Sequence, residues 1–98
     1  IIHAENLGLV PLGGGGPAAE RGAFTLGGRT PINPSGGLEP KRHPLGATGI
    51  GQLYELVTQL RGEAGARQVE GARHAIQENG GGLQGIEEAA VAVHILSR

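Results

Sequence analysis

The sequence predicts an α/β fold in which one amphipathic helix packs against a small sheet. Three features indicate this fold: a helical apolar stripe in the middle of the chain, two extended apolar runs near its end, and a glycine-rich turn between those runs. At 98 residues the chain is one domain at most, and burial at this size leaves its stability marginal. We therefore expect residues 1–98 to form part of one α/β domain, a mixed sheet with covering helices.

The first third of the chain contains few signals of regular structure. Residues 1–10 predict the end of a helix, with Asn6 and Gly8 as stop signals. Residues 11–17 combine prolines with a run of glycines and predict an irregular, exposed loop. Residues 19–33 predict short extended pieces, because their glycines and prolines prevent a full central strand.

The clearest element is a helix that begins near Ala47. Its apolar residues recur at the helical period, so they are expected to face the strands: Ile50, Leu53, Tyr54, Val57 and Leu60. Gly62 is a natural stop. Three glycines crowd the first turns, where glycine costs helix stability, and we expect another segment to approach closely there: Gly46, Gly49 and Gly51.

The last third predicts two strands around a glycine turn. Residues 63–71 form a charged connection, and residues 72–78 then alternate as a half-buried strand does. Residues 79–85 are a glycine loop. Residues 89–96 are almost continuously apolar, which is typical of a strand covered on both faces.

Composition excludes several classes of function. A formal net charge of −1 provides no electrostatic footprint for nucleic acid or an anionic membrane. The chain has no cysteine, which excludes disulfides, thiolate metal sites and a thiol nucleophile. No signal peptide and no apolar run of about 18 residues is present, so we expect a cytoplasmic protein. The chain has no methionine and begins Ile1-Ile2-His3, so we expect it to be part of a longer polypeptide.

His43 is the first candidate catalytic residue, since it stands in a loop that leads directly into the predicted helix. A helix N-terminus carries about half a positive charge, which disfavours imidazolium and leaves the ring able to accept a proton. A loop histidine that only hydrogen-bonds its own turn is the alternative. His3, His74 and His94 lie in separate elements without metal-ligand spacing, so no metal site is predicted, although the last two could meet across adjacent strands.

Two glycine runs are candidate binding loops. Gly13 to Gly16 lacks the lysine and hydroxyl residue of a phosphate-binding loop. Gly80 to Gly82 is more suggestive, because backbone N–H groups that converge there suit an oxyanion hole or a ligand carbonyl. A plain hairpin turn explains the same glycines equally well.

Two ordered motifs resemble a known family. Residues 33–37 read N-P-S-G-G, and residues 43–49 read H-P-L-G-A-T-G. Together they resemble the C-terminal histidine loop of the thiolase superfamily, written N-x-x-G-G, a spacer and G-H-P-x-G-A-[ST]-G. The likeness extends from about Leu7 to Arg98, and it is strongest to the sterol-carrier-protein or nonspecific lipid-transfer-protein branch.

The resemblance implies an activity and roles for two residues. Thiolases move acyl groups between coenzyme A and a nucleophilic cysteine, and each subunit has two similar halves. The matching histidine, His43, would activate that thiol and help to stabilise an oxyanion. The best match to the backbone N–H of the second oxyanion hole is Gly80. The family also implies acyl-CoA as substrate, no separate cofactor and a homo- or hetero-oligomer.

The chain departs from the family pattern at several points. The nucleophile belongs to the N-terminal half of the family's fold, and the second motif, N-E-A-F or H-D-C-F, would lie just before Ile1. Glu78 stands where typical thiolases carry the cysteine of C-x-G, a thiol that the lipid-transfer branch also lacks. Arg42 replaces the glycine of G-H-P, which puts a large side chain where the family has none.

These observations predict the C-terminal part of a thiolase-like acyl-CoA acyltransferase. Without a cysteine the chain is expected to be inactive alone, so its partner would be the N-terminal thiolase half or a partner subunit. Two alternatives stay open: a thiolase-fold scaffold or lipid-binding subunit that has lost catalysis, and a thiolase-like aldolase.

Overall fold

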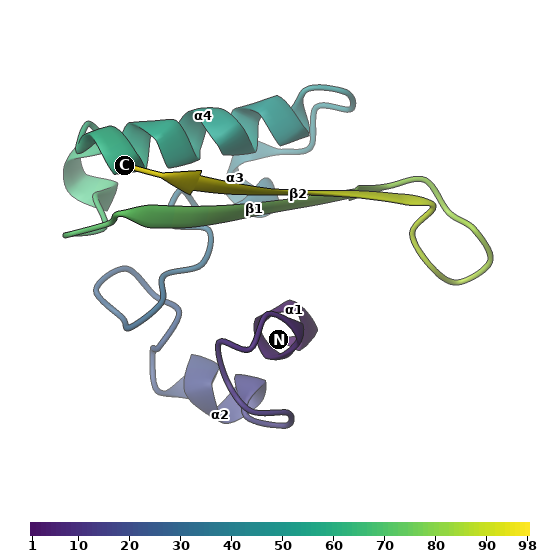
Figure 1. The fold of residues 1–98 in the computed structure, drawn as a ribbon, viewed down its shortest axis with the longest axis horizontal. Coiled ribbons are helices and arrows are strands. Elements are labelled where there is room, and N and C mark those ends of the chain that lie inside the picture. Colours follow the sequence, from purple (N-terminus) through teal and green to yellow (C-terminus); the bar gives the residue numbers. More distant parts are fainter. The chain divides into compact units, whose positions relative to one another are not determined.

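The computed structural model describes all residues 1–98, which divide into two compact units, Ile1–Pro34 and Ser35–Arg98 (Figure 1). The first unit contains two short helices, α1 (Ile2–Asn6) and α2 (Gly15–Glu20). The second unit contains the remaining elements: α3 (Leu38–Lys41), α4 (Thr48–Arg61), the 3₁₀ helix η1 (Gly65–Arg67), β1 (His74–Gly81) and β2 (Ala90–Ser97). No helix is both long and apolar enough to span a membrane.

The first unit confirms one predicted element and corrects another. Helix α1 ends at Asn6, as the stop signals indicate. The predicted irregular loop at 11–17 is wrong in its last part, because residues 15–17 belong to α2. Pro17 is compatible with the helix since it lies in the first turn, where the backbone N–H has no intrahelical partner. The Glu5 carboxylate accepts a hydrogen bond from the Gly15 N–H at 2.9 Å, and hydrogen bonds from the backbone of Gly13 and Gly15 lower the pKa of Glu5.

The expected extended pieces in residues 19–33 form no strand. Part of that range belongs to α2, and the rest consists of turns. Two backbone hydrogen bonds still join its ends, from the Thr30 N–H to the Ala23 carbonyl and from the Ile32 N–H to the Phe24 carbonyl, both at 3.0 Å. Two isolated bonds between turns do not build a ladder.

In the second unit, α4 runs along one face of the β1–β2 hairpin (Figure 1). The helix has Ala47 as its N-cap, as predicted. It ends at Gly62, whose φ of 76° is the left-handed conformation that glycine adopts without a Cβ penalty. The α/β fold class is therefore confirmed, but the sheet in this chain is antiparallel and not mixed, because one short connection joins its two strands.

The apolar stripe of α4 is only partly buried. Leu60 is buried, and Leu53 and Val57 are half-buried. Ile50 and Tyr54 are 69% and 70% exposed, which contradicts the prediction that the whole stripe faces the strands. A sheet of two strands is too narrow to cover the whole apolar stripe of α4.

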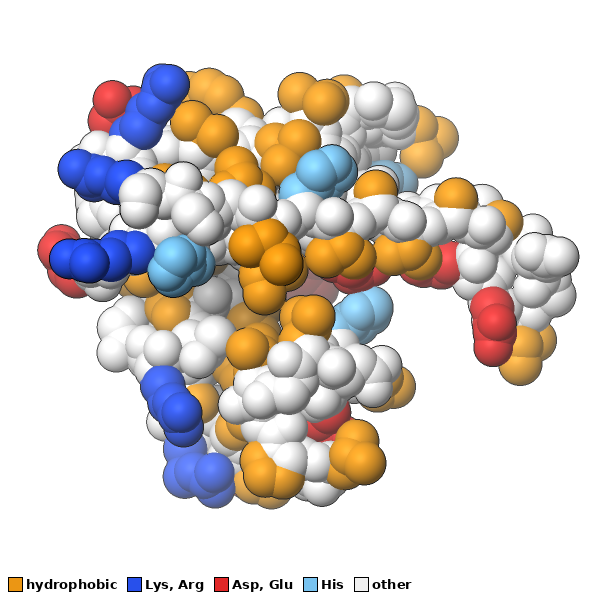
Figure 2. Space-filling view, viewed as in Figure 1, with side chains coloured by type: hydrophobic (Ala, Val, Ile, Leu, Met, Phe, Trp, Pro, Cys, Tyr) orange, Lys and Arg blue, Asp and Glu red, His pale blue; other side chains and the backbone are white.

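The hairpin strands lie close to the predicted ranges, with two corrections. Strand β1 continues through Asn79 to Gly81, so the glycine loop begins later than expected; Gly80 pairs with Val91 in the ladder. Strand β2 is not covered on both faces. Its outward side chains are more than half exposed: Val91, Val93 and Ile95. Figure 2 shows hydrophobic side chains in a row along the hairpin.

The three glycines at the start of α4 do not share one explanation. A Cβ on Gly49 would lie 3.5 Å from the Asn79 side chain, so β1 does approach the helix there. Nothing lies within 4 Å of a Cβ on Gly46 or Gly51. Gly46 is instead required by its φ of 81°, and nothing in the structure explains Gly51.

Candidate functional site

His43 and Gly80, the two residues that the sequence singles out, line the same pocket. Its volume is about 360 Å³, and it lies between the start of α4 and the hairpin. The lining residues are His43, Leu45, Gly46, Thr48, Gly49, Ile50, Leu53, Gln77, Asn79, Gly80, Gly81, Ala92 and His94. The pocket therefore combines an apolar wall with two imidazoles and exposed strand backbone.

The loop that carries His43 is tied down on its N-terminal side. Helix α3 ends at Lys41, whose Nζ lies 3.3 Å from Glu55 Oε2 on α4. Arg42 follows with φ 65° and ψ 178°, a conformation that is essentially reserved for glycine. The chain thus reaches His43 through a strained residue at the very position where the thiolase motif has glycine.

The hydrogen bonds of His43 define its neutral tautomer. His43 Nδ1 lies 2.7 Å from Thr48 Oγ1, and this hydroxyl donates its own hydrogen to the Pro44 carbonyl at 3.2 Å. The hydroxyl must then accept from the ring, so Nδ1 carries the hydrogen and Nε2 keeps a lone pair. The side chain is exposed, so Nε2 is accessible to a ligand in the pocket.

Gly80 lies in β1 and not in a loop. The carboxylate of Glu88 rests against its α-carbon, at the place where a Cβ would stand. The backbone of Gly80 therefore lines the pocket, and the Glu88 carboxylate occupies the space that a side chain at this position would need.

Sequence analysis missed a second group of polar side chains at this pocket. His94 Nδ1 lies 2.6 Å from Gln77 Oε1, and Gln77 Nε2 donates to Gln52 Oε1 at 2.6 Å. The three residues come from β2, β1 and α4, and Gln77 is only 4% exposed. The available signal was a histidine inside an otherwise apolar strand, opposite a glutamine.

The other histidines do not join the pocket. His74 pairs with Ser97 in the ladder, and its Nδ1 lies 3.0 Å from Ser97 Oγ, so it does not meet His94. His3 belongs to α1 in the first unit. The structure brings together no group of three or more metal-ligating His, Cys, Asp or Glu side chains.

Glu55 is a buried anchor for the segments around α4, and sequence analysis missed this role as well. Its carboxylate accepts hydrogen bonds from Arg67 Nε at 2.8 Å, Gln59 Nε2 at 3.2 Å and Lys41 Nζ at 3.3 Å. Burial raises the pKa of Glu55, but the hydrogen bonds from Arg67, Gln59 and Lys41 outweigh it, so the net pKa is lowered. The ionised carboxylate thus fixes both the His43 loop and η1.

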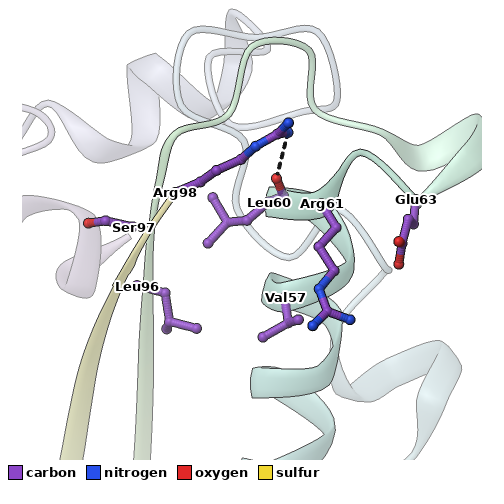
Figure 3. Close-up of a pocket in the computed structure, with 7 residues that line it drawn as sticks. All are labelled: Val57, Leu60, Arg61, Glu63, Leu96, Ser97 and Arg98. Carbon is purple, nitrogen blue, oxygen red and sulfur yellow. Dashed lines mark hydrogen bonds between the residues drawn. The ribbon is translucent and has the colours of Figure 1, made fainter.

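A larger pocket of about 520 Å³ lies at the opposite end of α4 and contains none of the predicted site residues. Figure 3 shows the apolar side chains of Val57, Leu60 and Leu96 there. The Arg98 guanidinium donates to the Leu60 carbonyl at 2.9 Å, which satisfies an end carbonyl of the helix. The arrangement is that of a helix C-cap.

Comparison with known proteins tests the resemblance seen in the motifs. Residues 1–98 match the family described as thiolase C-terminal domain-like. The chain is 54% identical to an acetyl-CoA acetyltransferase of Methanothermobacter thermautotrophicus over 98 residues, which is 100% of this chain and 24% of that protein. It is 60% identical to sterol carrier protein 2 of Bos taurus over 79 residues, which is 81% of this chain and 14% of that protein.

A third relative is named as one subunit of a larger enzyme. The chain is 37% identical to a benzoylsuccinyl-CoA thiolase subunit of Thauera aromatica over 70 residues, 71% of this chain and 18% of that protein. The chain thus spans about a quarter or less of the length of each of these relatives. The family match nevertheless covers every residue, so the chain belongs to the thiolase family, in its C-terminal domain.

Proposed function

We propose that this chain supplies the histidine and one oxyanion-binding N–H of a thiolase-like acyl-CoA acyltransferase. The observation that carries the proposal is the pocket shared by His43 and Gly80, in which His43 Nδ1 contacts Thr48 Oγ1 and Nε2 is left to face a ligand. Two of the relatives bear names that refer to coenzyme A thioesters, which supports an acyl-CoA as substrate.

In the proposed reaction, a cysteine thiol outside these residues gives its proton to His43 Nε2. The resulting thiolate attacks the thioester carbonyl carbon, and the carbonyl electron pair moves to oxygen, where the Gly80 N–H stabilises the negative charge. The tetrahedral intermediate then collapses, the bond from carbon to the coenzyme A sulfur breaks, and that sulfur takes up a proton. The acyl group is left on the cysteine.

The chain has no cysteine, so the nucleophile has to come from an N-terminal thiolase half or from a partner subunit. The subunit name of the Thauera relative supports an assembly of this kind. The isolated chain is expected to show no acyl transfer above background, and turnover by the chain alone would contradict the proposed chemistry.

A chimera tests the proposal directly. This chain would replace the matching region of the Methanothermobacter acetyltransferase, to which it aligns along its full length. The chimera should transfer acetyl groups, and His43→Ala should lower the rate by on the order of 10²-fold or more, the usual contribution of a positioned acid or base. His74→Ala is the matched control, because that exposed ring lies outside the pocket and its Nδ1 contacts Ser97 Oγ. Equal rates for both variants would contradict a role for His43.

A non-catalytic thiolase-fold scaffold or lipid-binding subunit is the second candidate. The observation that favours it is Arg42, an exposed side chain next to His43 where the family motif has glycine. A folded chimera that is inactive with Arg42 and active with Arg42→Gly would favour this second candidate for the natural chain.

A further inference from the structure

We propose that His94 is a second acid–base group in the pocket of His43, and that Gln77 is the residue that positions it. This inference rests on the proposed acyl transfer and adds a residue to it. It starts from the hydrogen-bonded chain that runs from His94 through Gln77 to Gln52.

The orientation of the Gln77 amide determines which nitrogen of His94 carries the hydrogen. Gln77 Nε2 donates to Gln52 Oε1, which leaves Gln77 Oε1 facing His94 Nδ1 at 2.6 Å. A carbonyl oxygen can only accept, so Nδ1 must be the donor and Nε2 is left with its lone pair. His94 thus has the same tautomer that Thr48 imposes on His43.

The pleat of β2 places His94 on the pocket side of the sheet. Side chains alternate between the two faces of a strand, and Ala92 and His94 both line the pocket. Val93 and Ile95 are therefore on the other face, where they are exposed. The pocket consequently contains two imidazoles, each held through Nδ1.

Gln77 suits a positioning role because it is buried and both ends of its amide are engaged. Its Oε1 accepts from Nδ1–H in both the neutral and the protonated form of His94. Nε2 can therefore gain or lose a proton while the ring stays in place. The sequence supplies a reason for such a group, since Glu78 stands where the motif of typical thiolases has a cysteine, and the chain has no cysteine of its own.

Two imidazoles balance the protons of the proposed reaction. In the first half, His43 Nε2 takes the proton of the attacking thiol, and protonated His94 gives its Nε2 proton to the departing coenzyme A sulfur. In the second half, the incoming acyl acceptor gives a proton to His94 Nε2, and His43 returns its proton to the cysteine sulfur as the new product leaves. Both rings then regain their initial states.

The first test is the tautomer of His94 in the 98-residue chain, read from long-range ¹H–¹⁵N correlations of its imidazole. We expect the Nδ1–H form for His94, and loss of that preference in Gln77→Leu. An Nε2–H ring in the unmodified chain would overturn the inference, because Gln77 would then be donating to Nδ1. This readout does not depend on activity.

The second test uses the active chimera. His94→Asn should lower kcat by on the order of 10-fold to 10²-fold and remove one limb of its pH profile. Gln77→Leu, which removes the acceptor, should move that limb to lower pH, whereas Gln77→Glu, whose carboxylate accepts from Nδ1–H and favours the imidazolium, should move it to higher pH; His74→Asn is the matched control. An unchanged rate and pH profile in His94→Asn, while His43→Ala is inactive, would overturn this inference alone. If neither histidine matters, the proposed function fails with it.

Discussion

Replacing Arg42 with glycine should stabilise the unit Ser35–Arg98. Arg42 has φ 65° and ψ 178°, and a side chain in such a region costs about 1–3 kcal/mol, whereas glycine adopts it freely. Glycine also gives the unfolded chain more conformational freedom, which offsets about 0.4–1 kcal/mol of the stabilisation gained by removing the strain. The side chain of Arg42 is exposed, so its removal forfeits little packing. We therefore expect Arg42→Gly to raise the free energy of unfolding by about 1 kcal/mol.

A gain of this size is readily measurable. In a chain of this length, about 1 kcal/mol raises the thermal midpoint by about 4–8 °C. The assay is thermal unfolding followed by far-ultraviolet circular dichroism, with chemical denaturation as a second measure of the free energy of unfolding.

Arg42→Ala is the control that separates backbone strain from the loss of charge and side-chain length. Alanine keeps the β-carbon and therefore the strain, so its stability should stay within about 0.5 kcal/mol of the parent, as for most surface substitutions. If Arg42→Gly melts at or below Arg42→Ala, the strain argument is wrong.

Three further predictions concern the helix and the hairpin. Glu55→Gln should lower the free energy of unfolding at neutral pH by about 1–3 kcal/mol through lost charge-assisted bonds. Because folding lowers the pKa of Glu55, its stabilisation is complete above the ordinary value of 4.5 and is lost as the pH falls below it, so acid denaturation between about pH 5 and 3 should be shallower in the variant. Leu53→Asp, at a half-buried position, should destabilise by about 2–5 kcal/mol, while Ile50→Asp, at a site 69% exposed, should stay within about 1 kcal/mol; equal losses in denaturant titrations would contradict the observed face of the helix. Gly80→Ala should shift the thermal midpoint only slightly, because the atoms nearest to the added Cβ belong to the movable Glu88 carboxylate. A large fall in the midpoint would show instead that Gly80 is required for folding.

Local rules were sufficient for much of the fold. The C-terminal ends of α1 and α4 follow from asparagine and glycine stop signals, which act within a few residues of the helix ends, and the start of α4 near Ala47 follows from its apolar period. The same is true of the His43 loop, whose motif lies within one continuous stretch. The family resemblance rests on the order of such motifs, and the full-length match confirms it.

Local rules failed where the partner lies far along the chain. The sequence predicts Pro17 in a loop, because the effect of a proline depends on whether it falls in the first turn of a helix or later. The sequence predicts Gly80 in a glycine loop, because only the register with Val91 makes it part of a strand. The helical period predicts that Ile50 packs against the strands, because it gives the face of a helix but not the width of the sheet beneath it.

By itself, the sequence determined the fold class, the position of the main helix, the family and the candidate role of His43, since each depends on residue order. Only the tertiary structure decided which side chains meet. It buried Glu55 beneath Arg67, twelve residues away, and joined His94 to Gln77 across the hairpin and to Gln52 on the helix. It also revealed the strain at Arg42. The physical reason is that a polar side chain can be buried only where distant segments complete its hydrogen bonds, and such segments are brought together by folding.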